Sequence, residues 1–452
     1  MFTYPDALRS ACMVAVFAAA NFAAAADGLS EMQTQKLFDV TEFGARADGE
    51  TLDTEAVQSA IDAAVDEGGG TVRFPAGVYL SSLLRVHGDH VTLFLEEGAT
   101  LSATTDLDAY PANQRRLLHV DRASDVHLRG PGTIDLKGRH FTRERRLSWR
   151  ILYFERSENV SVRDITIRRS PNWTLTFKNC DGVRVDGVRI EEGRLINSDG
   201  IGILSSRNVH ISNCFIDTSD DAIVIKSRDP DRADVTKNVL IEDCVVASSS
   251  NGVKIGTETR SDFRNITIRN IEVRKPSDGR RERPLSAIAI MTDDGGHIEN
   301  VRVENVRAEE VYAGFFIRVQ RRLRGERERP GTIRNLVIDG LHVERQLVAS
   351  SIMGIPDYEG APAVVGPDIR LRNIRIRSVE PGTAEDAERY PDERPTNYPD
   401  GIHFAPYPAY GLYIRHAVGV VVEPTVEFKS KEPDPRPAVR VEETAEVEFV
   451  PD

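Results

Sequence analysis

Three aspartates and one asparagine lie on two neighbouring, similarly patterned segments, and their types suit acid–base chemistry. Asn197 and Asp199 open the first segment, and Asp220 and Asp221 open the second about twenty residues later. If the segments stack as successive rungs, the carboxyl groups meet across one rung spacing of roughly 5 Å. Clustered carboxylates repel one another, which raises the pKa of at least one and leaves it a proton at neutral pH. A carboxylic acid beside a carboxylate suits hydrolysis of a glycosidic bond, whereas the alternative interpretation is a solvated acidic turn.

A short strand motif repeats along most of the chain and must position these residues. It alternates apolar and polar residues at period two, which indicates strands with one face inward. Successive copies lie about 22 to 35 residues apart, a spacing typical of stacked repeats. The copies begin at His90, Asp125, Asn159, Gly182, Asn208, Asn238, Asn265, Asn300, Asn335 and Asp368.

These repeats predict an all-β fold, a right-handed parallel β-helix with a short N-terminal capping helix. The recurrent asparagine before valine predicts ladders of side-chain amides at the bends between strands. The helix is expected over residues 54–65, with Thr54 as N-cap and an apolar stripe of Val57, Ile61 and Val65. Such a helix would cover the open end of the solenoid core. A β-propeller is the rival architecture, but its blades need longer and more uniform repeats.

One long segment interrupts the repeats near the C-terminus. Residues 381–408 are rich in proline, tyrosine and charge, and the strand-like stretch 411–423 follows them. We therefore expect a long ordered loop that packs against the solenoid. Such a loop would close one end of a binding site on the solenoid, which favours action on chain ends.

The domain organisation follows from the N-terminus and the length. Residues 1–26 combine Arg9 with an alanine-rich apolar run and a small-residue cleavage site, which is typical of a secretory signal peptide; a membrane anchor is the alternative. Residues 27–452 are expected to form a single catalytic β-helix domain, secreted or periplasmic, monomeric and not bound to membranes. The net charge of −13 argues against nucleic acid as a partner. It would also repel a polyanion at long range, so acidic ligands need local basic groups.

Cysteine usage predicts neither a disulfide framework nor a metal site. Once Cys12 leaves with the signal peptide, Cys180, Cys214 and Cys244 remain, an odd number. Cys214 and Cys244 occupy the same place in successive repeats, so we expect small buried side chains stacked on one another. A disulfide between these two is the alternative. No metal and no cofactor is expected.

Two sets of residues resemble a known family. The stretches FGARADGETLDTEAVQSAI at 43–61 and GGGTVRFPAGVYLSS at 68–82 look like the N-terminal signature of pectin-lyase-like β-helix proteins. The series Asn-x-Asp-Gly, Asp-Asp and Asn-Gly-x-x-Ile-Gly resembles glycoside hydrolase family 28, the polygalacturonases and their relatives. The likeness extends from about residue 38 to residue 436.

The resemblance implies a secreted hydrolase that cleaves α-linked galacturonate chains with inversion. Its substrate would be an acidic plant polysaccharide or oligosaccharide. By similarity Asp220 is the general acid, and Asp199 with Asp221 holds and deprotonates the attacking water. Asn197 would hydrogen-bond this cluster and orient it. The residues alone indicate an acid and a base without saying which aspartate is which.

The chain departs from the family pattern where the substrate carboxylate is bound. The family's histidine is replaced by Asn251, and its arginine and lysine are replaced by Ala289 and Met291. The loss of these cations predicts a specificity that differs from that of ordinary polygalacturonases. The site either accepts a neutral sugar there or recruits a cation from elsewhere.

Asn197 and Asn251 are candidates for substrate binding, and so are several cationic residues. Lys226 and Lys254 lie on neighbouring repeats, and Arg318 and Arg415 follow later strands. We favour Arg318 and Arg415 because an arginine fork matches a carboxylate better than a lysine point charge. His416 is a further candidate. For each of these residues, a surface or core position is the alternative.

The roles of two further acids stay open, and so do two other functional classes. Glu258 is either an additional acid near the site or a surface residue, while Asp294 is expected in a tight turn. A non-catalytic carbohydrate-binding β-helix is the first alternative to a hydrolase. A polysaccharide lyase is the second, and it would release a product with a new, ultraviolet-absorbing double bond.

Overall fold

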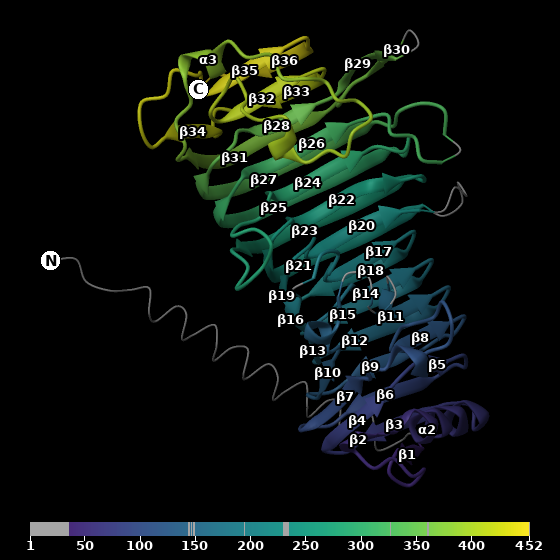
Figure 1. The fold of residues 1–452 in the computed structure, drawn as a ribbon. Coiled ribbons are helices and arrows are strands. Elements are labelled where there is room, and N and C mark those ends of the chain that lie inside the picture. The colour runs from purple at the N-terminus through teal and green to yellow at the C-terminus, as the bar shows by residue number, and fades with distance from the viewer. Residues whose placement is uncertain are drawn as a thin grey trace, which may run out of the picture.

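A computed structural model describes residues 36–451, apart from 143–144, 146, 148–149, 194, 229–234, 326 and 359–360. The predicted signal peptide, residues 1–26, lies outside the described residues. Within them the chain rises as a stack of rungs from the N-terminal helix to the C-terminal strands (Figure 1). No helix in this part of the chain has the length and apolar character needed to cross a membrane.

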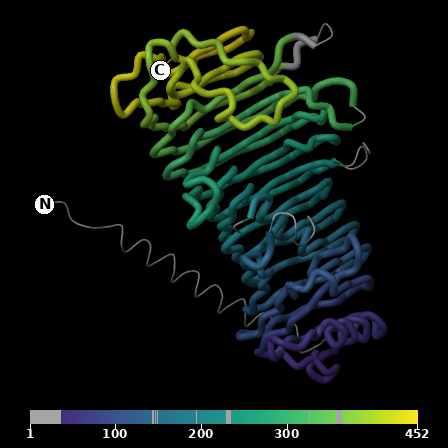
Figure 2. Tube along the Cα trace, in the orientation of Figure 1, coloured from purple at the N-terminus to yellow at the C-terminus, as the bar shows by residue number. Residues whose placement is uncertain are grey.

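Three stacks of parallel strands form the walls of the solenoid, which confirms the predicted right-handed parallel β-helix. One wall is a sheet of twelve strands, here called the twelve-stranded sheet. The other two walls join into one sheet of 22 strands, because β21 and several later strands bend from one wall into the next. The tube in Figure 2 shows the same succession of rungs.

The twelve-stranded sheet carries the candidate site. From the N-terminal end its strands are β5 (Leu84–Val86), β8 (Leu118–Asp121), β11 (Arg150–Glu155), β14 (Trp173–Lys178), β17 (Ile201–Leu204), β20 (Ile223–Ser227), β22 (Asn251–Thr259), β24 (Ser286–Thr292), β26 (Ala313–Val319), β28 (Ser350–Met353), β32 (Leu412–Arg415) and β35 (Val439–Glu442).

The second wall consists of β1 (Leu37–Asp39), β3 (Gly70–Phe74), β6 (Val91–Leu95), β9 (His127–Arg129), β12 (Glu158–Arg163), β15 (Asp181–Asp186), β18 (Arg207–Ser212), β33 (Val418–Val422) and β36 (Ala445–Phe449). The third consists of β2 (Asp48–Leu52), β4 (Gly77–Ser81), β7 (Ala99–Ala103), β10 (Thr133–Asp135), β13 (Thr166–Arg168), β16 (Arg189–Gly193), β19 (Phe215–Thr218) and β34 (Glu427–Ser430). Bent strands shared by both are β21 (Thr236–Ser248), β23 (Phe263–Arg274), β25 (Ile298–Val311), β27 (Ile333–Gln346) and β31 (Ile369–Ser378). An antiparallel hairpin of β29 (Ile355–Tyr358) and β30 (Ala361–Ala363) projects from the stack.

Asparagine ladders hold the rungs in register, as the repeats predicted. The amide of each of Asn238, Asn265, Asn300 and Asn335 donates to the asparagine one rung before it, at 2.7–3.1 Å. These residues have φ between 50° and 58°, the left-handed region that asparagine tolerates better than most residues. The repeated asparagine therefore turns the chain and links neighbouring rungs.

The core runs along the inside of the solenoid, where inward side chains of all three walls stack on their counterparts. Cys180, Cys214 and Cys244 belong to this core and are buried and free, which confirms the prediction of small buried side chains over a disulfide. Cys214 lies beside Cys244 in the stack. Burial raises the pKa of the Cys214 thiol well above its usual value, so it remains protonated.

The predicted N-terminal helix is present as α2 (Thr54–Asp66), which buries Val57 and Ile61 against the first rungs. The predicted N-cap is wrong by one residue, because Asp53 and not Thr54 holds that position. Asp53 makes no side-chain capping bond, since its carboxylate accepts from the backbone amides of Arg46 and Ala47. The Thr54 hydroxyl accepts instead from the backbone of Ser82, which ties the helix to the solenoid.

The predicted long loop packs back against the solenoid. It contains the short helix α3 (Ala384–Ala387), which Thr383 and Asp386 close with a reciprocal capping box. Residues 390–407 then run along the outer face of the twelve-stranded sheet and are here called the covering segment. Aromatic side chains anchor it, as Phe404 stacks on Phe316 of β26 and Tyr407 packs against Tyr413 of β32.

Candidate active site

The predicted aspartates come together on adjacent rungs of the twelve-stranded sheet. Asp199 lies two residues before β17, and Asp221 and Asp220 lie two and three residues before β20. These strands are parallel neighbours, with Ile201 paired to Ile223. The shared register brings the three carboxyl groups to one edge of the sheet, where each influences the ionisation of another.

Backbone amides fix the orientation of Asp220. Its carboxylate accepts from the amide of Asn197 at 3.1 Å and from the amide of Asp221 at 3.0 Å. Asn197 has a φ of 68°, so the chain turns there in the left-handed region. Asn197 thus contacts the cluster as predicted, through its main chain.

Two buried lysines hold the other two acids. The ammonium of Lys226 lies 3.1 Å from Asp199, and that of Lys254 lies 3.0 Å from Asp221. Both lysines were predicted to bind substrate. In the structure each lysine pairs with one aspartate of the acid cluster, and substrate binding by either lysine stays a prediction.

Asn251, which stands where the family has histidine, contacts the same cluster. Its side-chain amide donates to Asp221 at 2.7 Å, and its carbonyl oxygen accepts from the Ser286 hydroxyl at 2.7 Å. The second bond fixes which end of the amide faces the carboxylate. Asn251 therefore orients Asp221 without adding a charge.

The surroundings shift the pKa values of the three acids in different directions. Burial raises the pKa of Asp220, and the adjacent charge of Asp221 raises it further. Burial also opposes ionisation of Asp221, but Lys254, Lys226 and the Asn251 amide outweigh it and lower that pKa to about 2. Burial raises the pKa of Asp199 to about 8 despite the opposing charge of Lys226. The site therefore holds both a protonated and an ionised carboxyl group at neutral pH.

Asp220 is the most accessible of the three acids. Its side chain is 13% exposed, compared with 4% for Asp199 and 3% for Asp221. A proton donor must reach the leaving oxygen of a substrate, so this exposure favours Asp220 for that role.

An apolar cluster occupies the place where the family has cations. Ala289 and Met291 of β24 pack with Phe316, Phe404 and Tyr407, all buried on the outer face of the twelve-stranded sheet. The covering segment supplies Phe404 and Tyr407. Small and apolar residues at positions 289 and 291 therefore allow the segment to pack down on the sheet.

The covering segment reaches the acid cluster itself. The Tyr398 hydroxyl accepts a hydrogen bond at 3.0 Å from the Lys254 ammonium, which also pairs with Asp221. The two residues are 144 positions apart in the chain. Sequence reasoning missed Tyr398, since no local pattern links it to the acids.

Arg318 and Arg415 hold the covering segment. Arg318 is 2% exposed, donates to the carbonyl of Glu393 at 2.6 Å and lies over the Phe404 ring. Arg415 bonds the Pro391 carbonyl at 2.9 Å and pairs with the Glu393 carboxylate. Both arginines therefore anchor the covering segment in the structure, and their predicted substrate-binding role stays a prediction.

Replacing Arg318 with alanine is expected to destabilise the protein by about 2–3 kcal/mol, since a buried charge-assisted hydrogen bond is lost. Urea unfolding of Arg318→Ala beside wild type measures this. The matched control is Arg324→Ala, an exposed arginine expected to change stability by less than about 0.5 kcal/mol. Unchanged stability together with weaker substrate binding would restore the substrate-binding role.

The remaining candidates divide between the site and the framework. Glu258 faces Lys226 at 3.7 Å and Arg228 at 3.3 Å, so it lies beside the cluster; burial opposes its ionisation, but these cations lower its pKa to about 2. Asp294 is buried and accepts a two-pronged bond from Arg322, which makes it a structural residue. His416 contacts Glu393 and belongs to the anchoring of the covering segment.

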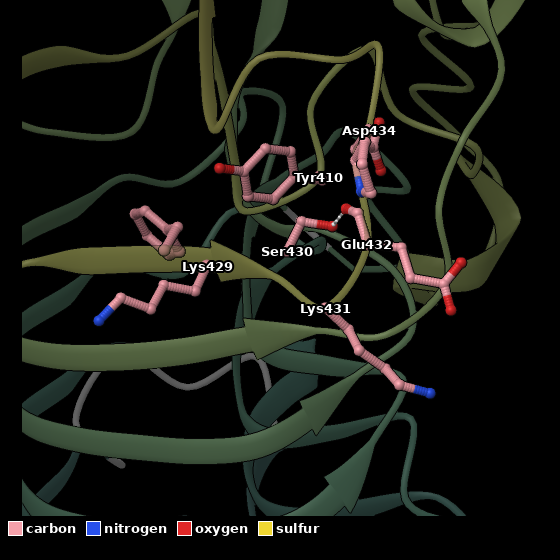
Figure 3. Close-up of a pocket in the computed structure, with 8 residues that line it drawn as sticks. Tyr410, Lys429, Ser430, Lys431, Glu432 and Asp434 are labelled. Atoms are coloured by element: carbon pink, nitrogen blue, oxygen red, sulfur yellow. Dashed lines mark hydrogen bonds between the residues drawn. The ribbon is translucent and has the colours of Figure 1, made fainter.

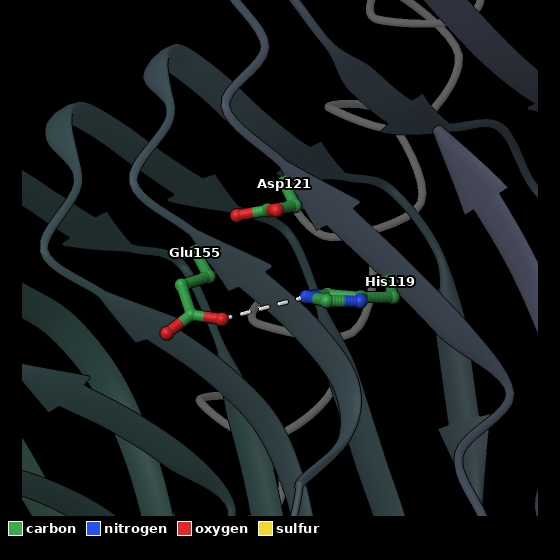
Figure 4. Close-up of side chains that lie close together, drawn as sticks. All are labelled: His119, Asp121 and Glu155. Atoms are coloured by element: carbon green, nitrogen blue, oxygen red, sulfur yellow. Dashed lines mark ion pairs between the residues drawn. The ribbon is translucent and has the colours of Figure 1, made fainter. Parts of the chain in front are cut away.

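Two further features of the surface lie away from the acids. Figure 4 shows His119 and Asp121 of β8 beside Glu155 of β11; Arg122 and Arg156 already pair with Asp121, so we assign no metal to this group. Figure 3 shows a pocket at the C-terminal end of the solenoid, whose lining residues come from Tyr410 and the stretch 428–434.

The protein is a parallel β-helix that carries a cluster of acidic residues at one edge of a sheet. Residues 70–339 match the family model for glycosyl hydrolases family 28. Residues 37–94 match a model for rhamnogalacturonase A/epimerase, pectate lyase-like. The first match spans more than half of the chain, so the chain belongs to glycosyl hydrolases family 28.

Relatives with similar sequences carry polygalacturonase names. The polygalacturonase of Chamaecyparis obtusa is 28% identical over 246 residues, which cover 50% of this chain and 46% of that protein. The endo-polygalacturonase of Pectobacterium parmentieri is 24% identical over 401 residues, 81% of this chain and 93% of that protein. The chain thus spans about half the length of the first relative and nearly all of the second.

Solved structures share the fold. The family 28 exopolygalacturonase of Yersinia enterocolitica superposes with a TM-score of 0.66 at 17% identity, covering 92% of this chain and 78% of that one. The exopolygalacturonase of Thermotoga maritima gives a TM-score of 0.55 at 19% identity, with coverages of 87% and 90%. At these identities the likeness shows the β-helix fold.

Proposed function

We propose that this chain hydrolyses glycosidic bonds of pectic polysaccharide or oligosaccharide in the manner of a polygalacturonase. The observation that carries the proposal is the meeting of Asp199, Asp220 and Asp221 on adjacent rungs of one sheet, where burial raises the pKa of Asp220 and Lys254 lowers that of Asp221. Membership of family 28 and the polygalacturonase names of the relatives support it. Family membership also favours a hydrolase over a lyase or a non-catalytic binding module.

The mechanism follows from the placement of the three acids, the greater exposure of Asp220 and the opposite directions in which the pKa values of Asp220 and Asp221 shift. Asp220 donates its proton to the glycosidic oxygen as the bond to the anomeric carbon breaks. Asp221 accepts a proton from the water that attacks this carbon from the opposite face, which inverts the configuration. Asp199 lies beside them and helps to hold this water.

The neighbouring residues position these groups. The Asn197 amide and the Asn251 side chain fix the directions of Asp220 and Asp221. Lys254 keeps Asp221 ionised, and Lys226 holds Asp199. These four residues act through the aspartates, so we assign them as positioning residues.

We further propose that the enzyme acts on chain ends. The covering segment lies over β24, β26, β28 and β32, the strands that follow the acid cluster. With Tyr398 bonded to Lys254, a polymer has no free sheet face on which to continue past the acids in that direction. The alanine-rich N-terminal stretch supports export, and a secreted or periplasmic monomer is the form that we propose.

Product analysis tests this function. Incubation with polygalacturonate and with neutral pectic fractions is expected to release reducing ends from the acidic substrate, without the ultraviolet absorbance of an unsaturated product. NMR should show an inverted anomeric configuration, and single sugars or short fragments should appear before the viscosity falls. Unsaturated products would indicate a lyase, whereas binding without any product would indicate a binding module.

A further inference from the structure

A group of cations and aromatic rings lies on the twelve-stranded sheet on the N-terminal side of the acids. The guanidinium carbons of Arg116 and Arg150 lie 4.9 Å and 5.2 Å from the centre of the Tyr153 ring. Arg150 also lies 5.6 Å from the centre of the Trp173 ring. Both rings are buried, at 3% and 4% exposure, while both arginines remain partly exposed. The rings therefore support the guanidinium groups from beneath and leave them open to solvent.

These two arginines differ from most others in the protein. Within the described residues, no carboxylate lies within 4.0 Å of either guanidinium, and the Nε atom of each is buried without a hydrogen-bond partner. Burial lowers the pKa of Arg116, and the nearby charges of Arg150 and Arg85 add to the effect, while Tyr153 and Glu155 oppose it. Two guanidinium groups that form no direct ion pair within the described residues make the position favourable for an anion, although the charge of Glu155 acts on Arg116 from farther away.

The group is continuous with the acid cluster. Lys226 lies 4.1 Å from the centre of the same Trp173 ring, on the face of the sheet where Lys226 pairs with Asp199. Tyr153 lies on β11, and β14 and β17 separate that strand from β20, which follows Asp220 and Asp221. At one rung spacing of about 4.8 Å, three steps place Arg150 roughly 14 Å from the rung of Asp220 and Asp221, farther than one sugar unit, and Arg116, which precedes β8, lies one rung farther.

We infer that Arg116 and Arg150 form a distal binding site for a carboxylate-bearing sugar of the same substrate chain. Tyr153 and Trp173 act as positioning residues that hold the two guanidinium planes. The inference rests on the proposed function, because it takes the acids as the place of cleavage. An arginine fork binds a carboxylate through two parallel hydrogen bonds, which a neutral sugar cannot accept with equal strength.

The site explains how a chain with a net charge of −13 binds a polyanion. Long-range repulsion is overcome locally, where two partly exposed arginines without a direct ion pair lie together. Because the covering segment lies over the strands beyond the acids, the substrate extends towards β11 and β8. Binding energy should therefore grow as the oligosaccharide becomes long enough to reach Arg116 and Arg150.

The test compares wild type with the double variant Arg116→Gln/Arg150→Gln on oligogalacturonides of increasing length. The double variant is expected to lose about tenfold or more in kcat/KM on the long oligomers, mainly through KM. The shortest cleaved oligomer should be processed at the wild-type rate. Equal loss at every length, or no loss at any length, would overturn the inference.

Control variants separate the site from general effects. Arg184→Gln removes an exposed arginine from β15 on another wall and should leave the length dependence unchanged. Arg150→Lys keeps the charge but removes the fork, and an intermediate KM is expected. If the double variant fails to fold, as judged by circular dichroism, the partly exposed Arg116→Gln alone is measured, and a wild-type length dependence would overturn the inference.

Calorimetric binding distinguishes this inference from the proposed function. If wild type does not cleave oligogalacturonides, the proposed function fails, and titration with a long oligogalacturonide still tests the site. Tighter binding by wild type than by the double variant would support a carboxylate site there. Equal binding by the two proteins, or equal binding of the fully methyl-esterified oligomer, would refute it.

Discussion

Replacing Asp220 with asparagine is expected to lower kcat on oligogalacturonides by at least about a hundredfold, because the site loses the proton that the leaving oxygen requires. The same two backbone amides, from Asn197 and Asp221, face residue 220 in the variant. The measurement is steady-state hydrolysis at several pH values, with the melting temperature as a check on folding. KM should change much less than kcat, since the substitution acts on the chemical step.

The control for Asp220→Asn is Asp164→Asn. Asp164 is also half-buried, and burial likewise raises its pKa, but it lies between β12 and β13 on the other walls. Its φ of 57° is one that asparagine accepts, so the substitution should preserve both fold and rate. Wild-type turnover by Asp220→Asn would transfer the acid role to another residue, and Asp199 would be examined next.

Replacing Lys254 with methionine is expected to shift the acid limb of the kcat/KM profile upward by one pH unit or more. Lys254 is the main charge that lowers the pKa of Asp221 to about 2. Without it the carboxylate is protonated at higher pH, so the base is lost as the pH falls through that raised value. Rates across the acidic range, fitted for the lower apparent pKa, measure the shift.

The same variant should also be less stable by about 3–5 kcal/mol, because removing one partner leaves a buried charge uncompensated. The direction in which stability changes with pH follows from the lowered pKa of Asp221. Its stabilising contribution in wild type is present above the unfolded value and is lost as the pH falls towards about 2. Lys275→Met, which breaks a more exposed ion pair with Glu310, serves as control. Lost activity with an unmoved acid limb would mean that Lys254 contacts the substrate and not Asp221.

The sequence determined the architecture of this protein because the signals for strands and bends are local and recur along the chain. Alternation at period two predicts strands, and an asparagine that tolerates positive φ marks each bend. The same repeat is enough to place Asp199 and Asp220 on successive rungs. Register in a solenoid copies one rung onto the next, so residues at equal positions in the repeat become neighbours in space.

Only the tertiary structure decided how this site differs from its relatives. The contact between Tyr398 and Lys254 spans 144 residues, and no periodic pattern encodes it. The covering segment contacts Arg318 and packs on Met291. An arginine that the sequence offered as a substrate-binding candidate therefore takes part in packing. The Nε atom of Arg116 has no hydrogen-bond partner within the described residues, and residue type alone could not distinguish this arginine from the many that form ion pairs. Pairing depends on which side chains the folded rungs bring within reach.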